Sequence, residues 1–339
     1  MKKAVIEHIV SYLPERRMDN EDLVAQIKCW TADEIYRKTG FLQRHIANPE
    51  ECASDLAFRA AKKLFQRQKG LAEEVDFLLF CTQSPDYFLP TTACLLQERL
   101  GLGRHCGALD FNLGCSGYVY GLSLAKGLIE SGQAKCVLLL TGETYSKFIH
   151  PLDRSVCTLF GDGATATIVR MVEHAAAGIG EFIFGTDGRG GGNLIVPAGG
   201  ARKPRSEATA VETVDEDGNV RSQDNLYMNG REVFRFAIQT VPEAINRLLI
   251  KSGLCQDDVD WLVLHQATRY MLDELLRKTR WPRTKVPYEF EDVGNTVSST
   301  IPIVLERLIA QGRLQTGHRV FLVGFGVGYS WGGCLVQWR

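Results

Sequence analysis

The stretch that decides the fold is Gly107-Ala-Leu-Asp-Phe-Asn-Leu-Gly-Cys-Ser-Gly117, where a strand runs into a helix. Its apolar residues alternate with polar or small ones as far as Gly114, which is typical of a strand. Apolar residues then recur at helical spacing until Gly132 ends the run. Cys115 is therefore expected at the corner between the strand and the helix.

A thiol at such a corner faces the positive end of the helix dipole and unpaired backbone N–H groups. Both favour the thiolate, so the pattern predicts a lowered pKa and a nucleophilic role for Cys115. The alternative is a small core residue, which is the usual role of a free cysteine.

Composition argues against several classes of protein. The 39 basic and 40 acidic residues give no overall field for nucleic acid or an acidic membrane surface. The ten cysteines form neither CxxC pairs nor a zinc pattern, as expected of reduced cytosolic thiols. Glu7 and His8 interrupt the first apolar stretch, and no window approaches the length of a membrane span. We therefore expect a soluble cytoplasmic protein that binds no nucleic acid, membrane or metal ion.

The second half of the chain repeats the order of the first. Residues 259–265 match 75–81 at an offset of 184, and 295–299 match 112–116 at an offset of 183. Two unrelated sites with almost one offset indicate a duplication. Strands that alternate with helices indicate sheets covered on both faces, with chemistry at the carboxyl ends of the strands.

The duplication predicts two similar halves, 1–175 and 176–339. A pseudo-twofold axis between them would bring Cys115, His265 and Asn295 to one cleft. Residues 198–224 form a polar insertion in the second half. We interpret the insertion as a solvated loop, the alternative being a flap over the cleft.

At these residues the chain resembles the 3-oxoacyl-acyl-carrier-protein synthase III (ketoacyl synthase III) family of the thiolase superfamily, over essentially its whole length. The matching stretches are Arg-His-Ile-Ala at 44–47, Gly-Cys-Ser-Gly at 114–117, Phe-Gly-Asp-Gly-Ala at 160–164, His-Gln-Ala at 265–267, Gly-Asn-Thr at 294–296 and Gly-Phe-Gly-Val-Gly-Tyr-Ser-Trp-Gly at 324–332. The resemblance implies a homodimer of α/β subunits with the five-layered αβαβα thiolase-like fold, built from duplicated halves with mixed, mostly parallel sheets.

The resemblance also implies a reaction, the condensation of an acyl thioester with malonyl-acyl carrier protein (malonyl-ACP). The acyl donor would be acyl-coenzyme A (acyl-CoA) or acyl-ACP, the products 3-oxoacyl-ACP and CO2, and no cofactor would be needed. Cys115 would hold the acyl group. Decarboxylation of the malonyl thioester needs hydrogen-bond donors rather than a base, and the side chains of His265 and Asn295 can donate.

Further positions are assigned by the resemblance alone. The backbone N–H groups of Cys115 and Val327 would form the oxyanion hole, although valine departs from the family's glycine run and tolerates unusual backbone angles poorly. Leu89 would enter the partner subunit's acyl tunnel. The tunnel itself would be lined by Met228, Phe234 and Ala267.

Two surfaces for the substrates follow in the same way. Arg154 would lie on the CoA side, but residues 33–35 read Asp-Glu-Ile, without the tryptophan that the family stacks on adenine. The stacking face is therefore missing or replaced. Arg269, Arg277 and Lys278 would dock the acidic carrier protein, the alternative being a solvated helix face.

Two other functions remain open. The same fold could transfer the acyl group to a hydroxyl or amine, which would not need Asn295. The chain could also be an inactive subunit of a heterodimer, which would not need Cys115. The presence of both residues favours the condensing enzyme.

Overall fold

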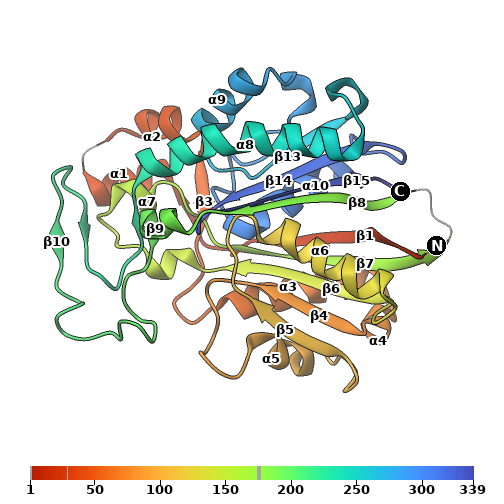
Figure 1. The fold of residues 1–339 in the computed structure, drawn as a ribbon. Helices are drawn as coiled ribbons and strands as arrows, with labels where there is room; N and C mark the ends of the chain where they lie inside the picture. The colour runs from red at the N-terminus through yellow and green to blue at the C-terminus, as the bar shows by residue number, and fades with distance from the viewer. Residues whose placement is uncertain (1, 29, 174–176) are drawn as a thin grey trace.

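Two β-sheets separate three layers of helices in the computed structural model, which describes residues 2–28, 30–173 and 177–339 (Figure 1). The first sheet has the order β1 (Lys2–Tyr12), β7 (Gly163–Glu173), β6 (Cys136–Glu143), β4 (Phe77–Cys81) and β5 (Gly107–Phe111). The second has the order β8 (Gly178–Thr186), β15 (Ser330–Gln337), β14 (Arg319–Gly326) and β13 (Trp261–Leu264).

The second sheet repeats four strands of the first in the same order and directions. β1 and β7 pair antiparallel, as do β7 and β6, while β6 and β4 pair parallel. The ladders β8·β15, β15·β14 and β14·β13 follow the same sequence of directions. The mixed sheets are as expected, although parallel pairing is less dominant than expected, being confined to β6·β4, β4·β5 and β14·β13. The expected boundary between the halves, at 175 and 176, lies outside the described residues.

The middle helical layer lies between the two sheets and is strongly apolar. It consists of α6 (Gly117–Glu130) and α10 (Thr300–Ala310), packed between the sheets. Their buried residues, such as Leu122 and Val304, share one core with Leu79 of the first sheet and Val320 of the second. Since both helices meet a sheet on each side, they can be apolar on most of their surface.

Amphipathic helices cover the outer faces. The first sheet is covered by α3 (Ala53–Arg67), α4 (Leu71–Glu74) and α5 (Thr92–Arg99). The second is covered by α8 (Gly230–Ser252) and α9 (Arg269–Thr279). The sheets and layers thus place the beginnings of α6 and α10, and the end of β13, at one end of the sandwich (Figure 1).

Short elements surround that end of the molecule. The helices are α1 (Asn20–Ile27), α2 (Ala32–Thr39) and α7 (Arg154–Cys157), with the 3-10 helices η1 (Tyr145–Phe148), η2 (Gly188–Asn193), η3 (Gln256–Asp258), η4 (Arg283–Lys285) and η5 (Val297–Ser299). The short strands are β2 (Arg17–Asp19), β3 (Gln43–His45), β9 (Leu194–Ile195), β10 (Thr213–Val214), β11 (Val220–Arg221) and β12 (Tyr227–Met228).

The polar insertion is a projecting segment that ends in the β10–β11 hairpin (Figure 1). Asp215 closes the hairpin turn by accepting hydrogen bonds from the backbone N–H of Asp217 and Asn219. The hairpin is tied down beside α7, because Arg221 bonds to the buried Asp153 at 2.7 Å. In the described part of the chain, no helix is long and apolar enough to cross a membrane.

Candidate active site

Cys115, His265 and Asn295 line one cavity of about 390 Å³. They come from three corners: the turn between β5 and α6, the residue after β13, and the turn before η5 and α10. The sequence places them up to 180 residues apart, and the duplicated sheets bring them together. Apolar side chains form most of the remaining wall, so charge that develops inside meets little water.

Two glycines of β14 leave space for Cys115, Gly326 for its sulfur and Gly324 for its backbone. A Cβ atom on Gly326 would lie 2.8 Å from Sγ, and one on Gly324 would lie 2.6 Å from the Cys115 carbonyl oxygen. Both distances are too short for any side chain. The backbone N–H groups of Cys115 and Val327 face the sulfur and stabilise its charged form.

The expected lowering of the pKa of Cys115 is wrong. Burial, and after it the nearby Glu143 carboxyl, raise the pKa of the thiol to about 12. The two backbone N–H groups lower it by less. Desolvation outweighs the hydrogen bonds because the whole side chain lies inside the protein.

His265 lies at the end of β13, with its ring held on two sides. Thr300 Oγ1 lies 2.7 Å from Nδ1, and the Phe325 ring meets the imidazole edge-on at 5.6 Å between centroids. Burial lowers the pKa of His265 to about 3, so the ring is neutral at physiological pH. Nε2 has no hydrogen-bond partner among the described residues, which leaves it available to a substrate.

Asn295 is oriented by the turn that follows it. Its Oδ1 accepts a hydrogen bond from the backbone N–H of Val297 at 2.9 Å. Val297 has a φ of 56°, a left-handed conformation that is unfavourable for a β-branched residue. Within the described part of the chain, the Asn295 amide nitrogen donates to no other group. The strained turn thus holds the carbonyl end of the amide and leaves the N–H₂ end available.

The backbone of Val327 lacks the unusual angles that a place in the glycine-rich run suggested. Among the described residues, the valine with left-handed backbone is Val297 rather than Val327. Val327 can therefore present its N–H without the backbone strain expected from the sequence. Its side chain faces Gly114, where a Cβ would lie 2.5 Å from Val327 Cγ1.

The expected tunnel residues divide into two groups. Met228, Phe234 and Ala267 line the same cavity as Cys115. Leu89 is not among the residues that line it and is 81% exposed, beside Phe88 at 86%. These two side chains lie at the tip of the loop between β4 and α5, which points away from the chain's own core.

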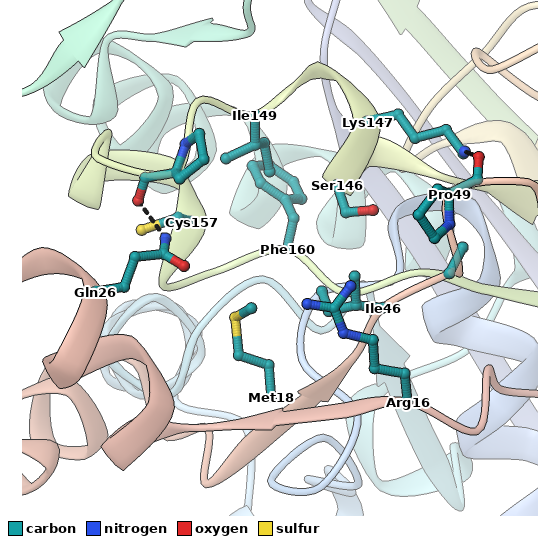
Figure 2. Close-up of a pocket in the computed structure, with 12 residues that line it drawn as sticks. Arg16, Met18, Gln26, Ile46, Pro49, Ser146, Lys147, Ile149, Cys157 and Phe160 are labelled. Atoms are coloured by element: carbon teal, nitrogen blue, oxygen red, sulfur yellow. Dashed lines mark hydrogen bonds between the residues drawn. The ribbon is translucent and has the colours of Figure 1, made fainter.

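A second cavity of about 280 Å³ lies beyond Phe160, the one residue that lines both cavities (Figure 2). Its other walls include Met18, Ile46 and Ile149, with Lys147 at one side (Figure 2). The backbone of Phe160 forms a parallel bridge with Asn295, which fixes the position of this shared wall.

Beside Arg154, on the side expected to bind coenzyme A, lies a residue that the sequence analysis did not predict. The Trp30 ring contacts two cations, with the Arg154 guanidinium 5.6 Å and the Lys38 ammonium 3.7 Å from its centre. The reasoning looked for a tryptophan after residues 33–34, whereas Trp30 stands just before Thr31, the N-cap of α2. An aromatic residue next to that capping box was the available signal.

The three predicted docking charges lie on α9 but differ in their surroundings. Arg269 is half-buried, donating to Glu291 and to the Tyr36 hydroxyl. Arg277 and Lys278 are exposed in the last turn, where Arg277 also contacts Glu274 at 2.8 Å. Lys278 has no acidic partner within the described residues. Among those same residues, no cluster of His, Cys, Asp and Glu side chains could hold a metal ion.

Comparison with known proteins agrees with this geometry. Family models for 3-oxoacyl-[acyl-carrier-protein (ACP)] synthase III match residues 109–188, and for its C-terminal part residues 249–338. The chain is 40% identical to beta-ketoacyl-[acyl-carrier-protein] synthase III 2 of Bacillus subtilis, covering 100% of this chain and 99% of the relative.

Solved structures extend the likeness to the whole fold. A 3-oxoacyl-(acyl-carrier-protein) synthase III structure at 2.1 Å is 55% identical, with a TM-score of 0.97 over 99% of this chain and 100% of that one. The 3-oxoacyl-(acyl-carrier protein) synthase from Burkholderia xenovorans LB400 is 37% identical, with a TM-score of 0.90 over 100% and 95%.

These likenesses define a condensing enzyme of the thiolase superfamily. The chain belongs to the 3-oxoacyl-[acyl-carrier-protein] synthase III family. It is accordingly an acyltransferase of the decarboxylative condensing type.

Proposed function

We propose that Cys115, His265 and Asn295 carry out a two-stage condensation of an acyl thioester with malonyl-ACP. The observation that supports this most is that these three side chains, from both halves of the chain, share one largely apolar cavity. Transfer to a hydroxyl or amine is not favoured, because it gives the available amide of Asn295 no task.

In the first stage the Cys115 sulfur attacks the acyl thioester. The acyl–sulfur bond to the donor breaks, a new one forms to Cys115, and the thiol proton passes to the departing thiol. The N–H groups of Cys115 and Val327 stabilise the charge on the carbonyl oxygen. Because burial keeps the thiol protonated, we expect the sulfur to lose its proton only during the transfer.

In the second stage the malonyl group loses CO2, and its electron pair forms an enolate. His265 Nε2 and Asn295 Nδ2 donate hydrogen bonds to the enolate oxygen. The enolate carbon bonds to the acyl carbon, and Cys115 leaves as a thiolate that takes a proton from solvent. No side chain has to act as a base, which suits an imidazole that burial keeps neutral.

We infer that the acyl donor is carried on coenzyme A. Trp30 supplies an aromatic face, and Arg154 and Lys38 supply positive charge beside it. An adenine ring can stack on indole, and phosphates are attracted to such cations. Trp30 thus replaces the stacking residue that the sequence lacks after position 34.

The carrier protein and a second copy of the chain are the proposed macromolecular partners. Arg277 and Lys278 are exposed near the cavity-lining Tyr270 on α9, where an acidic carrier protein could dock. The side chains of Phe88 and Leu89, exposed in the single chain, are of the kind that an interface buries. A homodimer would cover them.

The test is to incubate the protein with acyl-CoA and then with malonyl-ACP. Mass spectrometry should find the acyl group on Cys115, and 3-oxoacyl-ACP should follow. Cys115→Ala is the control and should give neither adduct nor product. Acylation without 3-oxoacyl-ACP would overturn the condensation, and an unmodified Cys115 would overturn the first stage.

A further inference from the structure

We propose that Thr300 is a positioning residue that fixes the tautomer of His265 by donating its hydroxyl proton to Nδ1. Thr300 opens α10, and its Oγ1 lies 2.7 Å from the imidazole nitrogen. Both side chains are nearly inaccessible, with exposures of 3% and 2%. The proposal rests on the proposed function, since it says how His265 presents a proton to the substrate.

The direction of this hydrogen bond follows from the neighbouring carbonyl. The Thr300 hydroxyl has one proton and two possible acceptors, Nδ1 at 2.7 Å and the Val297 carbonyl oxygen at 3.1 Å. The backbone N–H of Thr300 already donates to that carbonyl at the end of η5. The Val297 carbonyl thus has a donor without the hydroxyl and lies farther from it, at 3.1 Å against 2.7 Å, whereas Nδ1 is closer and has no other hydrogen bond among the described residues.

Because the imidazole is neutral, it carries a single proton, and the two ring nitrogens have opposite roles. If Nδ1 accepts from Thr300, the proton lies on Nε2, which then donates into the cavity. In the other tautomer, Nε2 would present a lone pair to the enolate oxygen and repel it. Loss of one such donor typically slows a reaction about 100- to 1,000-fold.

The arrangement also explains how the two functional side chains of the second half are coupled. The Val297 N–H holds Asn295, and the Val297 carbonyl takes the N–H of Thr300. One turn of backbone therefore orients the amide directly and the imidazole through a hydroxyl. Thr300 itself is not among the residues that line the cavity, so it acts through His265 rather than on the substrate.

The test combines nitrogen NMR with kinetics. The ¹⁵N shifts of the His265 ring, assigned by comparison with His265→Gln, should show the proton on Nε2 in the unmodified protein and in Thr300→Ser. Thr300→Val keeps the shape and loses the hydroxyl, so the Nδ1-protonated form should become populated. Condensation should fall about 100-fold in Thr300→Val, recover in Thr300→Ser, and leave the rate of Cys115 acylation unchanged.

A His265 ring protonated on Nδ1 in the unmodified protein would overturn the proposal. So would a Thr300→Val protein that keeps both the Nε2-protonated ring and the condensation rate. If Thr300→Val fails to fold, the spectrum of the unmodified protein still decides. Failure of the proposed function is distinguishable, because it would appear as normal condensation by His265→Ala, which has no side-chain donor, whatever the tautomer in the unmodified protein.

Discussion

Equivalent strands in the two halves of the molecule end on very different residues. β6 and β14 are both eight residues long and lie 183 positions apart, but β6 ends on Glu143 and β14 on Gly326. Gly326 leaves space for the sulfur of Cys115. Glu143 fills the same space in the other half and accepts a hydrogen bond at 3.5 Å from Ser298, the counterpart of Cys115.

The corner of the first half that Glu143 occupies is filled by hydrogen-bonded side chains. Glu143 also accepts hydrogen bonds from the Gln83 N–H and the Ser84 hydroxyl, and it is completely buried. Cys81, at the end of β4, is the counterpart of His265 in the first half. Its thiol donates a hydrogen bond to the Leu113 carbonyl oxygen. The comparison teaches that duplication supplies two similar corners, and that side-chain size at one strand end decides which of them opens into a cavity.

The sharpest way to break the comparison is to remove the equivalent asparagines. Asn295→Ala should lower condensation about 100- to 1,000-fold, because it deletes a donor to the enolate, and should leave Cys115 acylation intact. Its counterpart Asn112 is exposed, so Asn112→Ala is the matched control and should retain normal rates. Steady-state kinetics with malonyl-ACP and mass spectrometry of the acyl-enzyme would check both. Equal losses in the two variants would contradict the assignment.

Gly326→Ala tests the open corner directly. A methyl group there would meet Sγ at 2.8 Å and displace the nucleophile, so acylation of Cys115 should fall about 100-fold. Gly127→Ala, on α6, adds the same methyl group where nothing lies within 4 Å and should leave acylation unchanged. Pre-steady-state acylation rates give the measurement. An acylation rate in Gly326→Ala equal to that of Gly127→Ala would show that the glycine does not create the site.

Glu143→Gln tests whether the charge of Glu143 in one corner affects the pKa of Cys115 in the other. Burial raises the pKa of Glu143 to about 8, and its ionised form raises the pKa of Cys115. Without that charge the thiol should ionise at lower pH, so the rate of alkylation by iodoacetamide should rise at lower pH in Glu143→Gln. Glu74→Gln, on the surface, serves as control. An unchanged or upward-shifted profile would refute the coupling.

The last expected effect concerns stability in acid rather than catalysis. The pKa of His265 falls from 6.5 in the unfolded chain to about 3 in the folded one. Between these values the unfolded state binds the extra proton, so stability is complete above pH 6.5 and is lost as the pH falls, by at most about 1.4 kcal/mol per pH unit. Urea unfolding of His265→Gln should show a shallower acid loss than that of the unmodified protein. A steeper loss would contradict burial as the cause.

Sequence reasoning placed Cys115, His265 and Asn295 in one cleft because the duplication relates their positions. The same repeat predicted two similar halves with sheets covered on both faces, while the five layers followed from the family resemblance. It misjudged the acidity of Cys115, because burial and Glu143 act through the packing of β6 against the α6 corner. Neither is visible in a local pattern. It also assigned Arg269 only to docking, since its contact with Glu291 joins segments that merely fold together.

Two further residues were beyond a motif search for different reasons. Trp30, just before α2, approaches Arg154 of α7 from more than 120 positions away in the sequence. Thr300 reaches His265 because the beginning of α10 packs against the end of β13. Spacing along the chain can suggest which residues share a cleft. The atoms that face each other within it depend on backbone turns that the residue types alone leave open.

The glycine at the end of β14 has a consequence for how such proteins diversify. Since a substituent as small as a methyl group competes with the sulfur for one volume, position 326 offers no graded series of variants through which activity could be tuned. Altered substrate preference is therefore expected to arise elsewhere on the cavity wall, which includes Met228 and Phe234. The position of the Cys115 sulfur is therefore fixed, and we expect variation among such proteins in the residues that line the cavity.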